Sequence, residues 1–94
     1  MEVQTHDVNK REEYYALQIV EEALEKKKTN PTLNCALYIK EEMNSQFGGF
    51  GWNCFFVDSA SDLSWSIDPY KSIIIKMDDG KISIFIFRMV IKCF

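Results

Sequence analysis

The chain has 94 residues, of which 47% are hydrophobic and 27% are charged, and its formal net charge at pH 7 is −3. The length fits a single domain, 1–94, and the composition is that of a folded globular protein. The negative charge argues against a nucleic-acid-binding protein, because phosphate binding needs an excess of lysine and arginine. Charged residues also interrupt the apolar C-terminal run, so we expect no membrane partner.

The first half of the sequence predicts two helices. Residues 1–8 are polar and show no period, so we expect them to be disordered. From about Lys10 the apolar residues recur at helical spacing, at Leu17, Val20, Ala23 and Leu24. The lysines at 26–28 end this first helix where its dipole favours positive charge.

The second helix is expected from Pro31 to about Gln46. Asn30 suits the N-cap and Pro31 suits the first helical position, where no N–H is needed. The apolar stripe of this helix consists of Ala36, Ile39, Met43 and Phe47. A run rich in glycine at 48–51 then ends the helix and turns the chain.

The second half changes to a period of two, which is typical of strands. Strands are expected at residues 52–57, 63–67, 72–77 and 81–89. The last two strands are joined by Asp78-Asp79-Gly80, a hairpin turn. Two helices followed by strands predict an α+β fold with a four- to five-stranded antiparallel sheet.

The last two expected strands are apolar on both faces. One face would carry mainly isoleucine, and the other would carry Ile74, Phe85 and Phe87. Two helices joined by a short connection cover one face, and leaving the other wet would forfeit about 1.5–3 kcal/mol per large side chain. We therefore predict a homodimer whose sheets face each other, with these three residues in the interface. The alternative places one helix on each face.

Particular residues occur in a recognisable order along this framework. The second helix contains Ile39-Lys40-Glu41-Glu42, Phe47 follows it, and Trp52 and Cys54 open the next strand. Ser64-Trp65 and a closing strand that ends in a basic residue come later. Together these residues resemble the eight-kilodalton cytoplasmic and axonemal dynein light chains. The resemblance covers about residues 15–88 and rests on the ordered combination, not on a single motif.

The resemblance implies a non-catalytic homodimer with strand exchange, in which one strand of each subunit crosses to its partner. Two symmetric grooves would then bind extended segments of other proteins by strand addition. Two segments bound together would gain avidity. The expected partners are dynein intermediate chain or other proteins with linear motifs. The expected location is the cytoplasm and cytoskeleton, including the axoneme of a cilium or flagellum.

The same resemblance assigns residues to the groove and to the dimer interface. The groove residues would be Leu63, Ser64, Trp65, Ser66, Ile67, Leu33 and Met77. The interface would contain Trp65, Asp68, Ile74, Phe85 and Phe87, and paired Asp68 carboxylates across the axis would have raised pKa values. Several of these positions depart from the family pattern, which puts its Thr-Gln-Thr ligand preference in question: Leu33, Leu63, Ile67, Asp68 and Met77.

Catalytic and metal-binding patterns are weak. The three cysteines form no CxxC pair, so we expect free thiols in a reducing compartment. His6 is the only histidine, and Cys54 has no expected base beside it. The acidic residues Asp58, Asp62 and Asp68 lack the spacing of a metal site. We therefore predict no enzyme, cofactor or metal. The alternatives are a structural subunit with a closed groove and a small thiol-dependent enzyme.

Overall fold

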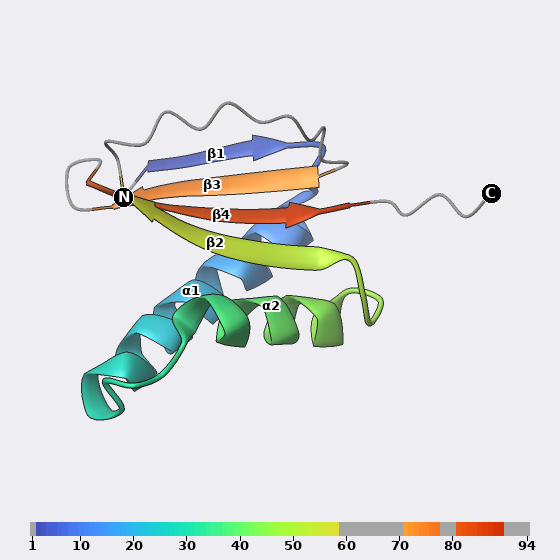
Figure 1. The fold of residues 1–94 in the computed structure, drawn as a ribbon. Helices are drawn as coiled ribbons and strands as arrows, with labels where there is room; N and C mark the ends of the chain where they lie inside the picture. Colours follow the sequence, from blue (N-terminus) through green and yellow to red (C-terminus); the bar gives the residue numbers. More distant parts are fainter. Residues whose placement is uncertain (1, 59–70, 78–80, 90–94) are drawn as a thin grey trace.

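Figure 1 shows an antiparallel sheet with two helices packed below it. The computed structural model describes residues 2–58, 71–77 and 81–89. Its elements in chain order are β1 (Glu2–His6), α1 (Lys10–Thr29), α2 (Cys35–Gln46), β2 (Trp52–Asp58), β3 (Lys71–Met77) and β4 (Ile82–Arg88). The strand order is β1-β3-β4-β2, and every neighbouring pair is antiparallel. This confirms the α+β fold class.

The N-terminal segment is a strand, so the expectation that residues 1–8 are disordered is wrong. β1 pairs with β3 in antiparallel register, with Val3 opposite Ile75. Val3 is the one apolar residue of β1, and it packs against the core. The strand escapes prediction because its hydrogen bonds come from a distant part of the chain, while its own composition is polar. The strand expected at residues 63–67 lies outside the described residues.

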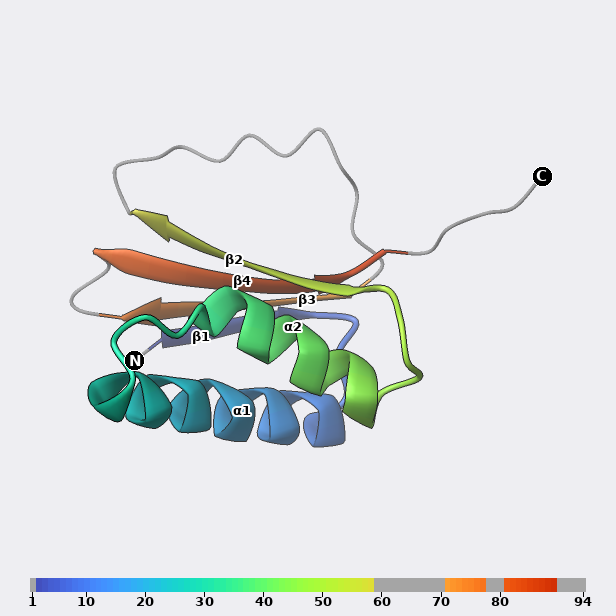
Figure 2. The same cartoon turned by 60° about the horizontal axis from the view of Figure 1, so that its bottom comes forward.

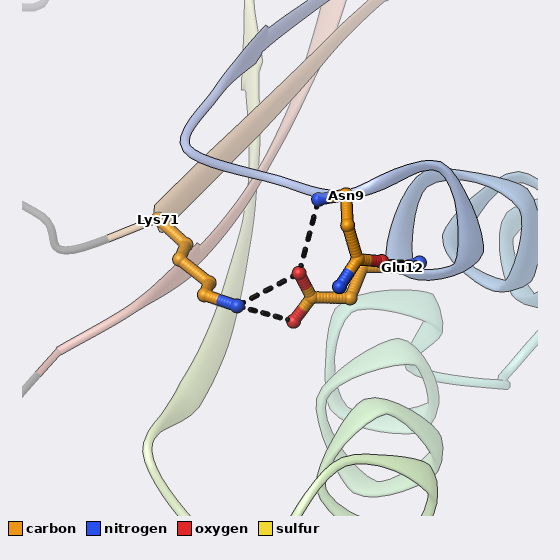
Figure 3. A network of polar contacts seen from close by, with 3 residues as sticks. All are labelled: Asn9, Glu12 and Lys71. Atoms are coloured by element: carbon orange, nitrogen blue, oxygen red, sulfur yellow. Dashed lines mark hydrogen bonds and ion pairs between the residues drawn. The ribbon is translucent and has the colours of Figure 1, made fainter.

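α1 begins at a capping box that is also fastened to the sheet. The Asn9 side chain accepts a hydrogen bond from the Glu12 N–H at 2.8 Å, and the Glu12 carboxylate accepts one from the Asn9 N–H at 3.2 Å. Figure 3 shows that the Lys71 ammonium, at the start of β3, donates to both oxygens of the same carboxylate at 2.8 Å. Glu12 is only 4% exposed. This buried ion pair joins the helix N-terminus to the central part of the sheet.

α2 starts four residues later than its expected N-cap implies. Asn30 closes α1, because its N–H donates to the Lys26 carbonyl at 2.9 Å. Asn34 is the N-cap of α2 instead, and its side chain accepts from the Leu37 N–H at 3.1 Å. Pro31 therefore lies in the turn between the helices. Both asparagines suit an N-cap by residue type, and the structure uses the second.

Both helices lie on the same face of the sheet, as Figures 1 and 2 show from two directions. The alternative with one helix on each face is therefore wrong. The buried side chains that face the helices include Ile73, Ile75, Ile84 and Ile86, all 0% exposed. They pack with Ile39 and with residues of α1 in one cluster. Neither described helix is long and apolar enough to cross a membrane.

Candidate binding surfaces

The sheet face away from the helices carries large apolar side chains. The strand register aligns Phe55 of β2 with Phe85 of β4, and Phe85 with Ile74 of β3. The Phe55 and Phe87 rings are 5.5 Å apart. Phe55 is 52% exposed, whereas Phe87 is only 6% exposed. We call these four residues the outer face, and neither helix covers it (Figure 2).

The outer face includes the three interface residues that the sequence predicts, and it adds one that was missed. Ile74, Phe85 and Phe87 share this face, as the alternation in β3 and β4 indicates. Phe55 was not predicted. The alternation of side chains in β2 could have assigned Phe55 to the outer face. Trp52 and Cys54 face the helices, and neighbouring side chains in a strand point to opposite faces. Whether this face forms an interface stays a prediction.

An apolar pocket with a volume of about 540 Å³ opens where the helix junction meets the end of the sheet. The described residues that line it come from α1, from the connection to α2 and its first turn, and from three strands: Leu24, Lys27, Leu33, Asn34, Cys35, Ala36, Phe56, Met77 and Ile82. The sequence assigns Leu33 and Met77 to one groove, and the structure places both on this pocket. Phe56, which is 38% exposed, was missed.

A second hollow of about 510 Å³ adjoins the pocket. Its described lining consists of Phe56, Val57, Lys81 and Ile82, so the two hollows share Phe56 and Ile82. Both hollows lie at the end of β2. We call the pocket and the second hollow the end groove.

The end groove lies beside an edge of the described sheet. Among the described strands β2 has one neighbour, β4. Among the described residues, the other side of β2 beyond Trp52 is a place where a further strand could add. Residues 63–67 and Asp68, which the sequence assigns to the groove and the dimer interface, lie outside the described residues.

A pair of hydrogen bonds fixes β2 against α2. The Trp52 N–H donates to Asn44 Oδ1 at 2.9 Å, and Asn44 Nδ2 donates to the Trp52 carbonyl at 3.2 Å. The Asn44 amide thereby takes the place of a backbone partner at the start of the strand. Phe47 packs beside Trp52, with ring centroids 6.1 Å apart. These contacts set the spacing between α2 and β2, the two elements that flank the end groove.

The buried cysteines do not fit nucleophilic catalysis. Cys35 and Cys54 are both buried free thiols. Burial, with a smaller contribution from nearby Cys35, raises the pKa of Cys54 to about 12. The reactive thiolate is therefore scarce at neutral pH. The described residues contain no group of three or more His, Cys, Asp or Glu side chains that could hold a metal ion.

The buried Cys54 thiol is expected to make the protein less stable at alkaline pH. The folded state keeps a proton that the unfolded state releases above its ordinary pKa of 9.0. The free energy of unfolding should therefore fall between about pH 9 and about pH 12, by at most ~1.4 kcal/mol per pH unit. Urea unfolding at about pH 8 and about pH 10 measures this slope. Cys54→Ala should show a shallower slope, and an identical slope would contradict the assignment.

Comparison with known proteins identifies the family. The family model described as dynein light chain type 1 matches residues 1–89. A comparison with individual curated proteins gave no match. The family match includes β1, both helices and the strands that frame the end groove, so it covers every element described above. The chain therefore belongs to the dynein light chain family.

Proposed function

We propose that the protein is a non-catalytic, homodimeric light chain that binds extended segments of partner proteins by strand addition. The observation that carries this proposal is the position of the apolar pocket beside the edge of β2 with which no described strand pairs, in a chain of this family. Strand addition needs both features, because main-chain hydrogen bonds supply affinity and side-chain pockets supply specificity. As a dynein subunit it would act on the cytoskeleton, in the cytoplasm or in an axoneme.

The outer face supports the homodimer. Both helices pack on the opposite face, and Phe55 remains half exposed. A second copy placed sheet to sheet would cover Phe55, Ile74 and Phe85 with the same residues of its partner. Such self-complementary pairing is the commonest symmetry of soluble oligomers.

The edge of β2 with which no described strand pairs supports strand exchange. We propose that residues 63–67 of the second copy pair with this edge and extend the sheet by one strand, whose own outer edge then receives the partner segment. The extended sheet and α2 would then form the two walls of the groove, with Leu33, Phe56 and Met77 at its floor. In this arrangement Asp68 lies near the dimer axis, as the resemblance implies.

Titration of a fluorescent peptide from dynein intermediate chain tests the proposal. We expect saturable binding with a dissociation constant on the order of micromolar, and one peptide per subunit. The matched control is the same peptide with methylated amides at alternate positions, which cannot complete a strand ladder and should bind much more weakly. No binding up to about millimolar concentration would contradict the proposal and favour a structural subunit with a closed groove.

A further inference from the structure

The chemistry of the end groove indicates which side chain it accepts. Most of the described lining is aliphatic or aromatic, and it includes Leu33, Phe56, Met77 and Ile82. An amide or hydroxyl group that enters such a lining loses its bound water and gains no hydrogen bond in return. An apolar side chain enters without that cost.

The polar residues that line the pocket are mostly engaged within the protein. Asn34 accepts from the Leu37 N–H at 3.1 Å as the N-cap of α2. The Cys35 thiol, only 5% exposed, donates to the Ala23 carbonyl at 3.7 Å. The Cys35 thiol and Asn34 Oδ1 are thus engaged by neighbouring backbone groups, and the one charged group of the described lining is the ammonium of Lys27.

Lys27 differs from the lysines on either side of it. Lys26 pairs with Glu22 at 3.3 Å, and Lys28 pairs with Glu25 at 3.1 Å. Within the described part of the chain, Lys27 makes no salt bridge, and neither does Lys81, which lines the second hollow. The end groove is therefore an apolar floor flanked by two lysines that no described carboxylate neutralises.

We propose that the partner segment inserts a large apolar side chain, such as leucine or phenylalanine, into the pocket and carries acidic residues beside it, facing Lys27 and Lys81. This inference rests on the proposed function, because it specifies the ligand of the same groove. The apolar side chain fits the lining, and the acidic neighbours match the charge of the two lysines.

Four fluorescent peptides of about ten residues test this inference. They share one sequence except for a central leucine or glutamine and for flanking aspartates or lysines. The leucine peptide with aspartates should bind about tenfold more tightly than its glutamine counterpart, because the amide would be buried without a partner. It should also bind more tightly than the leucine peptide with lysines, by a ratio that shrinks as salt rises.

Charge reversal at one lysine locates the acidic flank. Lys27→Glu should abolish or invert the preference for aspartate over lysine flanks. The matched control is Lys28→Glu, which changes the same charge in the same helical turn but does not line the pocket, and it should keep the preference. A preference that persists unchanged in Lys27→Glu would overturn the charge assignment.

A second pair of variants locates the apolar side chain. Leu33→Lys should weaken the leucine peptide about tenfold or more, whereas Leu37→Lys, on an exposed position of α2 outside the pocket, should leave it unchanged. Equal or tighter binding of the glutamine peptide would overturn this inference while peptide binding as such still supports the proposed function. If neither these peptides nor the intermediate-chain peptide bind, the proposed function fails, and this inference fails with it.

Discussion

Lys71→Met is expected to lower the free energy of unfolding by about 3–5 kcal/mol. Lys71 is the ammonium partner of the Glu12 carboxylate, and the two side chains are 17% and 6% exposed. Removing the ammonium leaves a buried carboxylate without its counter-charge, which is among the most costly changes to a protein core. Urea unfolding followed by circular dichroism measures the loss.

A double variant distinguishes the energetic effect of the ion pair from that of side-chain packing. Glu12→Gln keeps a side chain that can accept from the Asn9 N–H in the capping box but removes the charge. The double variant Glu12→Gln with Lys71→Met should therefore regain much of the stability that Lys71→Met loses. Lys28→Met, which removes the ammonium of an exposed pair, should change stability little. Equal losses in the single and double variants would contradict this account.

Phe55→Asp is expected to convert the proposed dimer into a monomer, with a dissociation constant raised at least about hundredfold. Two-fold symmetry places the substitution in the interface twice. Each new carboxylate would be buried against apolar residues of the outer face without a counter-charge. Sedimentation equilibrium of the wild type and the variant measures the change.

Phe50→Asp is the matched control for this prediction. Phe50 is 69% exposed and lies in the loop between α2 and β2, away from the outer face. The same substitution there should leave self-association unchanged. Dissociation in both variants, or in neither, would contradict the assignment of the outer face as the interface.

Local periodicity predicts the helices and strands whose buried residues repeat regularly within one segment of the sequence. α1 begins at Lys10, as the sequence predicts. It is predictable because its apolar stripe and the lysines that end it lie in one continuous segment. The alternation in β3 and β4 correctly assigns Ile73, Ile75, Ile84 and Ile86 to the helix-covered face and Ile74 to the other. Long-range contacts could not be predicted in this way. Glu12 and Lys71 are 59 positions apart, and nothing near either residue indicates their pairing.

Two residues that the resemblance assigns to the groove, Leu33 and Met77, line the end groove. The resemblance indicates them because each stands where the family has a characteristic residue of another type. Phe56 was not found, since a hydrophobic residue in a strand is typical of the core and only the structure shows it half exposed at the edge. The sequence assigns Lys27 only to the charged end of the first helix. The neighbouring residues do not reveal which of the lysines lines the pocket.

The solution mass of the chain tests the central claim most directly. Sedimentation equilibrium at micromolar concentration should give twice the chain mass of 11.0 kDa, as the proposed homodimer requires. A single species at the chain mass would contradict the homodimer, and with it the proposed exchange of residues 63–67 that builds the groove.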